Sequence, residues 1–197
     1  MLPCADLDLS RVDSPAYVID LAMLEQNLKL LAHARAAAGA TILLALKGFA
    51  AWSTFPLVGQ YLDGVSASGP DEARLGREEL GKQVHTYCPA FDETSLREAI
   101  RYSDHVIFNS PSQIDRFRSI IEAHANHVSF GLRVNPQVSS SDYLLADLAR
   151  PFSRLGEWDP AKIEQVIEQI SGFMFHNNCE NADFDRFDEM LGAIEDR

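Results

Sequence analysis

The chain has few cysteines, and they lie far apart. Its 197 residues include three, Cys4, Cys88 and Cys179. This number and spacing argue against a disulfide framework and against a zinc site of the Cys-X-X-Cys kind. We therefore expect reduced thiols, which fit a cytoplasmic protein.

The sequence also lacks long apolar runs. No window approaches the ~18 consecutive apolar residues that a membrane-spanning helix needs. The first residues, MLPCADLDLSRVD, are acidic and contain no hydrophobic stretch of the kind found in signal peptides. These features predict a cytoplasmic protein that does not enter a membrane.

Basic residues are scarce relative to acidic ones. The chain has 17 Lys and Arg against 29 Asp and Glu, which gives a net charge of −12. Phosphate backbones and anionic lipid head groups would repel such a chain, so nucleic acids and membrane surfaces are poor partner candidates. A cationic ligand is compatible with this charge. With 46% hydrophobic and 23% charged residues, the composition is that of an ordinary globular domain.

Short apolar runs alternate with amphipathic helical stretches from about residue 16 onward, which indicates an α/β fold. The predicted strands are 17–19, 41–46, 65–67, 84–87, 105–108, 129–134 and 173–175. Six β/α units follow the first predicted helix, whereas a complete eight-unit barrel typically takes ~250 residues. The pattern fits an incomplete (β/α)8 TIM-type barrel over residues 21–197, preceded by an N-terminal segment and strand over 1–20. An open doubly wound sheet is the alternative.

Several helices have recognisable start signals. Asp20 precedes an apolar stripe, and Ser110-Pro111-Ser112-Gln113 has the pattern of a capping box. Asp159-Pro160 predicts an N-cap followed by one helix with the stripe Ile163, Val166, Ile167 and Ile170. A last helix is expected from about Asn181. The stretch 135–156 is irregular, and loops of this length are usually functional or mobile.

Ligands of parallel α/β folds bind at the carboxyl ends of the strands, so the residues at these ends are candidates for a site. Lys47 follows the apolar strand TILLAL. An ammonium group that is partly desolvated there would have a lowered pKa and offer a neutral amine for Schiff-base chemistry. A solvated lysine at a strand end is the alternative interpretation.

Three further strand-end residues have both a functional and a structural interpretation. His176 follows Phe-Met-Phe and could stack on a planar cofactor or transfer a proton, or it could be a hydrogen-bonded structural histidine. Arg133 could bind a phosphate or carboxylate through its planar fork, or form a structural ion pair. Cys179, next to two asparagines, could contribute to an anion site or belong to a simple polar loop; no base is placed to activate it as a nucleophile.

Nine motifs along the chain resemble the carboxynorspermidine/carboxyspermidine decarboxylases, and they occur in the order that this family shows. The resemblance extends over about residues 13–195. The motifs are residues 14–20 (SPAYVID), 42–50 (ILLALKGFA), 61–68 (YLDGVSAS), 72–79 (EARLGREE), 85–87 (HTY), 108–110 (FNS), 131–136 (GLRVNP), 153–156 (SRLG) and 176–180 (HNNCE).

The resemblance implies a decarboxylase of the alanine-racemase-like, fold type III group, which depends on pyridoxal 5'-phosphate (PLP). Lys47 would hold the cofactor, His176 would stack on its ring and Arg133 would join the polar network beside it. Cys179 and Glu180 would lie near the phosphate or the substrate, with Ser153 and Arg154 on an adjoining active-site loop. The substrate would be carboxynorspermidine or carboxyspermidine, a small cationic molecule, and the full-length family is expected to form homodimers.

The sequence departs from this family in two ways. Residues 148–152 (LARPF) stand where the family usually has Cys-Ala-Pro-Gly, directly before Ser153. The family's remaining barrel units and its C-terminal β domain have no counterpart, so we expect an N-terminal portion or a shortened form with doubtful activity alone. A single-domain PLP carrier without catalysis is the alternative, and a sugar-phosphate barrel with a structural Lys47 is a third interpretation.

Overall fold

A computed structural model describes residues 8–138, 141, 147–176 and 183–195 of the chain. Six parallel strands form one sheet in the order β1-β2-β3-β4-β5-β6. They are β1 (Leu43–Ala45), β2 (Gly64–Ala67), β3 (Gln83–Tyr87), β4 (His105–Phe108), β5 (Ser129–Arg133) and β6 (Gly172–Met174). Because the strand order never reverses, the sheet is the wall of a partial barrel, as predicted, and the doubly wound alternative is wrong.

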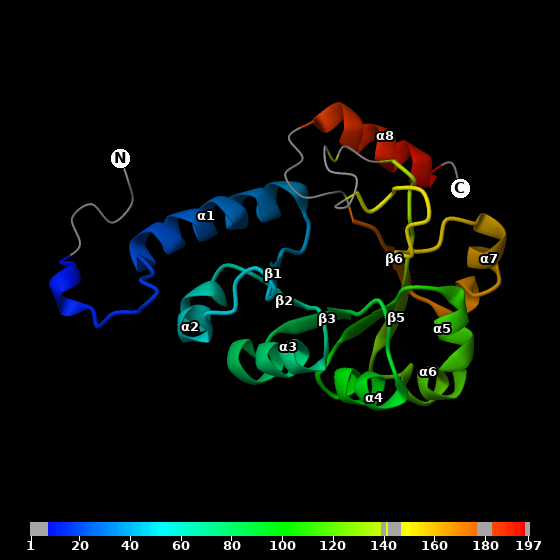
Figure 1. The fold of residues 1–197 in the computed structure, drawn as a ribbon, viewed down its shortest axis with the longest axis horizontal. Helices are drawn as coiled ribbons and strands as arrows, with labels where there is room; N and C mark the ends of the chain where they lie inside the picture. The colour runs from blue at the N-terminus through cyan, green and yellow to red at the C-terminus, as the bar shows by residue number, and fades with distance from the viewer. Residues whose placement is uncertain (1–7, 139–140, 142–146, 177–182, 196–197) are drawn as a thin grey trace.

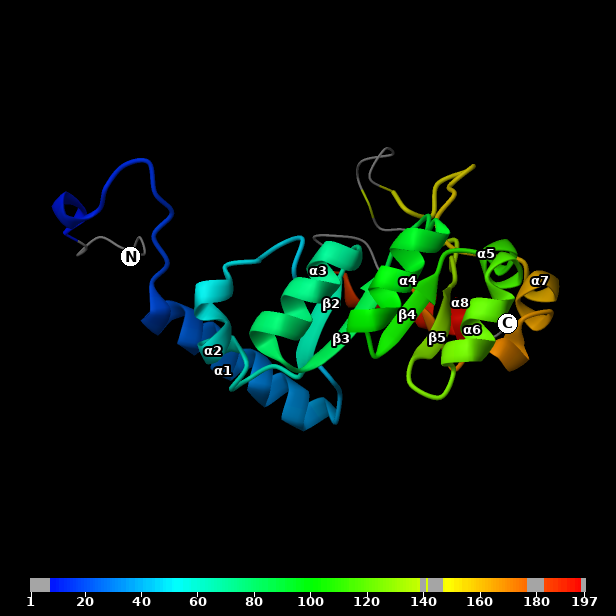
Figure 2. The same ribbon diagram turned by 90° about the horizontal axis from the view of Figure 1, so that it is seen from below.

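Helices cover one face of this sheet. They are α1 (Leu21–Ala38), α2 (Phe55–Val58), α3 (Pro70–Leu75), α4 (Glu93–Tyr102), α5 (Pro111–Arg116), α6 (Arg118–His124), α7 (Pro160–Glu164) and α8 (Phe184–Glu195). Shorter helical turns are η1 (Leu9–Arg11), η2 (Trp52–Thr54), η3 (Gly76–Leu80) and η4 (Ile167–Gln169). Helices α3 to α6 follow one another along the outer face, and α1 extends beside α2 at the β1 side (Figures 1 and 2).

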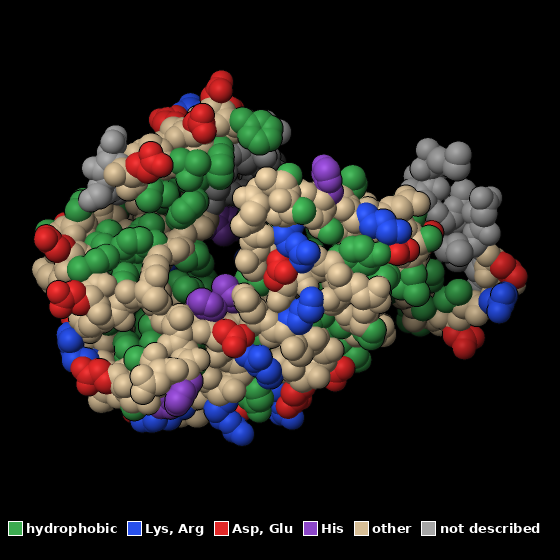
Figure 3. Space-filling model, turned by 180° about the vertical axis from the view of Figure 1, so that it is seen from behind, with side chains coloured by type: hydrophobic (Ala, Val, Ile, Leu, Met, Phe, Trp, Pro, Cys, Tyr) green, Lys and Arg blue, Asp and Glu red, His purple; other side chains and the backbone are tan. Residues whose placement is uncertain are grey.

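The strands alternate between the two faces of the sheet, as pleated strands must. On β3 and β4, Val84 and Val106 are fully buried beneath the helices. His85 and His105, paired directly with each other in the register, are half-buried and line a hollow of about 520 Å³ on the opposite face. Viewed from behind, the molecule shows a hollow in the middle of this face with histidine side chains beside it (Figure 3).

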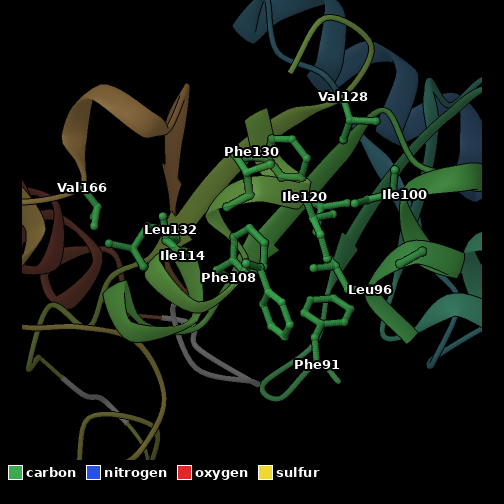
Figure 4. Close-up of a cluster of buried hydrophobic side chains, with 14 residues drawn as sticks. Phe91, Leu96, Ile100, Phe108, Ile114, Ile120, Val128, Phe130, Leu132 and Val166 are labelled. Carbon is green, nitrogen blue, oxygen red and sulfur yellow. The ribbon is translucent and has the colours of Figure 1, made fainter. Parts of the chain in front are cut away.

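The largest core cluster lies between β4, β5 and helices α4 to α6 (Figure 4). Phe108 is at its centre: its ring stacks with those of Phe117 and Phe130 at centroid distances of 6.3 and 6.0 Å, and meets Phe91 edge-on at 6.0 Å. Aromatic pairs in these geometries add to the stability that burial alone provides. This cluster fixes β4 and β5, whose carboxyl ends carry part of the candidate site.

Two aspartates fasten the amino ends of the strands. Asp63 directly precedes β2 and accepts hydrogen bonds from Arg35 Nη1 at 2.7 Å and from the backbone N–H just ahead of β1 at 3.0 Å. Asp104 directly precedes β4 and accepts from Arg77 Nη2 at 2.7 Å and from the second N–H of β3 at 2.8 Å. Each aspartate therefore links the strand that it precedes to a helical segment and to the neighbouring strand.

The strand predicted at residues 17–19 is not formed. These residues have no regular secondary structure, and Tyr17 is fully exposed. An extended segment is stable as a strand only when a neighbour completes its hydrogen bonds. Within the described part of the chain no strand lies beside this segment, since the sheet begins at β1.

The single helix predicted after Asp159 is broken. Asp159 caps α7 as expected, accepting from Ala161 N at 3.0 Å, but α7 ends at Glu164 and a separate turn, η4, follows. At Val166 the backbone leaves helical values (φ −119°, ψ 2°), and its side chain is buried in the main core cluster. Core packing of this valine therefore outweighs continuation of the helix.

Candidate active site

The strand-end residues predicted from the sequence lie along one edge of the sheet. Lys47 is in the turn after β1, Arg133 is the last residue of β5, and His176 follows β6. Burial is the main cause that lowers the pKa of His176, and the positive charges of Arg133 and Lys47 lower this pKa further. His176 is therefore within electrostatic reach of both cations.

Lys47 is held by a tight turn. The backbone N–H groups of Gly48 and Phe49 both donate to the carbonyl oxygen of Ala45, at 3.0 and 3.1 Å. The lysine side chain itself is exposed. The predicted desolvation of this ammonium group is therefore wrong for the described structure, although the predicted position at the strand end is confirmed.

His176 presents a neutral ring with one free nitrogen. Its imidazole is half-buried, and Nδ1 is buried without a hydrogen-bond partner among the described residues. Because the pKa of the ring is lowered, the neutral form dominates at pH 7. A structural histidine would be expected to satisfy its buried nitrogen, so this geometry favours the ligand-facing interpretation.

Arg133 is a buried cation with spare hydrogen-bonding capacity. Only 5% of the residue is exposed, and within the described residues it forms no ion pair with a carboxylate. Its Nη1 donates to the Tyr87 hydroxyl at 2.8 Å, and its guanidinium carbon lies 4.9 Å from the centre of the Tyr87 ring. Nε is buried and has no hydrogen-bond partner in the described part of the chain. Such a group is suited to binding an anion.

Tyr87 and Asn109 extend this contact to a loop, and sequence reasoning assigned neither of them a role. Burial raises the pKa of Tyr87, so its hydroxyl keeps its proton and donates it to Asn109 Oδ1 at 2.8 Å. Asn109 Oδ1 also accepts from Gly156 N at 2.9 Å, and Asn109 Nδ2 donates to the carbonyl oxygen of Arg154 at 2.7 Å. The signal that could have found both residues is their position at the ends of β3 and β4.

The predicted capping box at Ser110 is not formed. Helix α5 begins at Pro111 as expected, but Ser110 makes no side-chain cap. The Gln113 side chain instead accepts from the backbone N–H of Asn109 at 2.8 Å and donates to the carbonyl oxygen of Pro89 at 3.0 Å. The glutamine thus holds the strand end from which the Asn109 side chain projects.

Gly156 allows the loop to approach β5. Its φ is +80°, and a Cβ at this position would lie 2.9 Å from the carbonyl carbon of Val134 and 3.1 Å from Cγ of Arg133. Only glycine fits both the backbone conformation and the space. The next residue, Glu157, then pairs with Val134 in an isolated parallel bridge.

The structure brings part of the predicted loop to the site. The backbone of Arg154 is held by Asn109, whereas its side chain is exposed. The Ser153 hydroxyl accepts locally from Leu155 N at 3.3 Å, so no described hydrogen bond joins Ser153 to Lys47 or His176. Cys179 and Glu180 lie outside the described residues.

The hollow below the strand ends holds a second feature that sequence reasoning missed. The rings of His85 and His105 lie 4.0 Å apart between centroids and are tilted by 33°. Burial and the neighbouring His105 lower the pKa of His85 to about 4, while Asp104 acts in the opposite direction. His85 is therefore uncharged at neutral pH where it faces the hollow.

Comparisons with known proteins agree with the resemblance found in the sequence. No family model matches the chain. The chain is 47% identical to carboxynorspermidine/carboxyspermidine decarboxylase of Herminiimonas arsenicoxydans over 186 residues, which are 94% of this chain and 50% of that protein. The chain spans about half the length of the curated relatives it matches.

Solved structures show the same fold. A crystal structure of carboxynorspermidine decarboxylase from Campylobacter jejuni with norspermidine matches at a TM-score of 0.80 and 35% identity, covering 94% of this chain and 46% of that one. A variant of the protein SrLDC, solved in complex with PLP, matches at a TM-score of 0.70 and 20% identity over 94% of this chain and 47% of that one. Among the described residues, no helix combines the length and apolar character needed to cross a membrane.

Proposed function

We propose that this chain, a homologue of the carboxynorspermidine/carboxyspermidine decarboxylases, carries the cofactor-binding strand ends of a PLP-dependent decarboxylase. The observation that supports this most is the grouping of Lys47, Arg133 and His176 at the carboxyl edge of the sheet, close enough for the two cations to depress the pKa of the histidine. The substrate would be carboxynorspermidine or carboxyspermidine, and the product norspermidine or spermidine.

The residues at this edge fit PLP, a planar aldehyde with a phosphate group. Lys47 offers an exposed amine, His176 a neutral ring, and Arg133 a buried cation whose Nε has no partner among the described residues. An amine, a flat uncharged surface and an anion-binding group are what such a cofactor requires. When bound, PLP would accept the electron pair that remains on the substrate when CO₂ departs.

Each side chain has its own role in this proposal. The Lys47 amine anchors the cofactor at the end of β1. The neutral ring of His176 lies against the cofactor and adds no charge there. Arg133, held by Tyr87, supplies positive charge to an anionic group. Roles for Ser153 and Arg154 beside the substrate, and for Cys179 and Glu180 near the phosphate, remain predictions.

The partners and location of the protein are part of the same proposal. A substrate that carries several ammonium groups suits a chain with a net charge of −12, because long-range attraction raises its rate of encounter. Homodimer formation and a cytoplasmic location complete the proposal, and neither nucleic acid nor a membrane surface is a proposed partner.

Cofactor binding is tested by incubating the purified chain with PLP, reducing it with borohydride and mapping the labelled peptide by mass spectrometry. We expect visible absorbance from the lysine-bound cofactor and a label on the peptide that contains Lys47. Lys47→Ala should abolish both signals. Lys29→Ala is the matched control, because Lys29 is an exposed lysine paired with Glu25 on α1, away from the strand ends.

Two outcomes would contradict the proposal. If the wild-type chain takes up no PLP, or if Lys47→Ala is labelled as strongly as Lys29→Ala, Lys47 does not anchor the cofactor. Adding carboxynorspermidine to the loaded chain and measuring released CO₂ then separates a decarboxylase from a carrier that binds PLP without catalysis.

A further inference from the structure

The hydrogen bonds around Asn109 have a fixed direction. Arg133 Nη1 donates to the Tyr87 oxygen, which leaves the single hydroxyl proton of Tyr87 for Asn109 Oδ1. The same Oδ1 accepts from Gly156 N, and Nδ2 donates to the Arg154 carbonyl oxygen. Only one orientation of the Asn109 amide satisfies all of these partners, because its oxygen meets two donors and its nitrogen meets an acceptor.

These contacts join parts of the chain that are remote in sequence. Asn109 is 22 residues from Tyr87 and 47 from Gly156, and Tyr87 is 46 residues from Arg133. The bonds therefore connect the ends of β3, β4 and β5 to the loop that follows β5. This hydrogen-bond network runs from the buried guanidinium of Arg133 to the backbone of residues 154–156.

Both ends are constrained in further ways. Gln113 fixes the backbone of Asn109, as described above. Gly156 lies against Val134 and the stem of Arg133, with no room for a Cβ between them. In such a network each bond polarises and orients the next, so that loss of one link weakens the others.

From this geometry we infer that Asn109 is a positioning residue: it holds Arg133 through Tyr87 and binds the backbone of residues 154–156 directly, which keeps both in one arrangement. The link to PLP rests on the proposed function, in which Arg133 meets an anionic group of the cofactor. Asn109 does not itself contact the reacting atoms in this proposal. Its effect on cofactor binding passes through Arg133.

Tyr87→Phe is the most informative variant, because it removes only the oxygen that links Arg133 to Asn109. Tyr61→Phe is the matched control: its hydroxyl donates to Glu25 of α1 at 2.6 Å, and Tyr61 precedes the amino end of β2. Asn109→Ala removes the side-chain hydrogen bonds of Asn109 to Tyr87, Gly156 and Arg154. Two quantities are measured for each protein: the hydrogen-exchange rate of the Gly156 amide by NMR, and the dissociation constant for PLP.

We expect Tyr87→Phe to speed exchange of the Gly156 amide and to weaken PLP binding, each by about tenfold, the size expected for one lost hydrogen bond. Asn109→Ala should have a larger effect on exchange, and the double variant should bind PLP no more weakly than Asn109→Ala alone, because both changes cut the same path. Tyr61→Phe should leave both quantities unchanged.

Unchanged exchange in Tyr87→Phe would overturn the coupling, because Arg133 and the loop would then be held independently. Faster exchange with unchanged PLP affinity would overturn the positioning role. If the wild-type chain binds no PLP, the proposed function fails, whereas the exchange rates still decide whether Asn109 couples Arg133 to the loop.

Discussion

The two ends of the same parallel strands are stabilised in different ways. At the amino ends, Asp63 and Asp104 each combine an arginine with a backbone N–H, so charge and hydrogen bonding are both satisfied. At the carboxyl ends, Arg133 is held only by the neutral hydroxyl of Tyr87, and polar atoms of Arg133 and His176 stay unpaired among the described residues.

This difference separates stability from ligand binding. A carboxylate beside Arg133 would neutralise the charge of the guanidinium and weaken its attraction for an anionic ligand. A neutral phenol orients the guanidinium without neutralising it. Lys47 and Arg133 therefore carry positive charge at the carboxyl edge, whereas Asp63 and Asp104 lie at the opposite edge. Barrel folds commonly divide their ends in this way.

Removing Asp104, at the amino ends of the strands, should have the largest effect on stability. Asp104→Ala loses the contact to Arg77 and leaves a backbone N–H of β3 without its acceptor. Since the pair is partly exposed, we expect a loss of about 2 kcal/mol in the free energy of unfolding, measured by urea denaturation.

The control for this variant is Glu98→Ala, which removes an exposed pair with Arg101 and should cost under about 0.5 kcal/mol. PLP binding by Asp104→Ala should equal that of the wild type under conditions where both are folded. A weakened affinity would show that the two ends are not separate.

Lowering the pH should reduce the stability of the fold through His85, which lies in β3 between the two ends of the sheet. The pKa of His85 is about 4 in the folded chain, below its usual 6.5. The unfolded chain then binds the extra proton first, so stability is fully present above pH 6.5 and falls as the pH drops toward 4. Allowing for solvent at this half-buried site, we expect about 1 kcal/mol from this residue.

His85→Gln should flatten this part of the pH profile, measured by urea denaturation at several pH values. His127→Gln replaces an exposed histidine and should leave the profile as it is in the wild type. A His85→Gln profile as steep as that of the wild type would assign the acid sensitivity to other groups.

The smallest effect is expected at the loop of the carboxyl end. Phe152 has φ +64° and a fully exposed ring. Phe152→Gly should raise the free energy of unfolding by about 0.5 kcal/mol, since relief of the left-handed conformation exceeds the added entropy of the unfolded chain.

Phe152→Ala separates the two contributions of this residue in the same urea denaturation experiment. Alanine keeps the cost of the left-handed backbone conformation and removes the ring, so Phe152→Ala should not raise the free energy of unfolding. Equal gains from both variants would point to the exposed ring, and the backbone conformation would then not be the cause.

The sequence predicted well those features that depend on local pattern. Apolar runs identified all six strands of the sheet, and the predicted strand ends correctly placed Lys47, Arg133 and His176 along one edge. What it missed depends on tertiary contacts. The Tyr87–Asn109 bond joins residues that no local spacing relates, burial of Val166 breaks a helix that periodicity supports, and residues 17–19 lack the neighbour that a strand needs.

The pairing of His85 with His105 also bears on how the sheet assembles. If β4 slipped by one residue along β3, His105 would turn toward the helices and Phe108 toward the hollow. Placing this imidazole without partners beneath the helices would cost a few kcal/mol, and Phe108 would lose its stacks with Phe117 and Phe130. The two histidines thus help to select the correct alignment of neighbouring strands during folding.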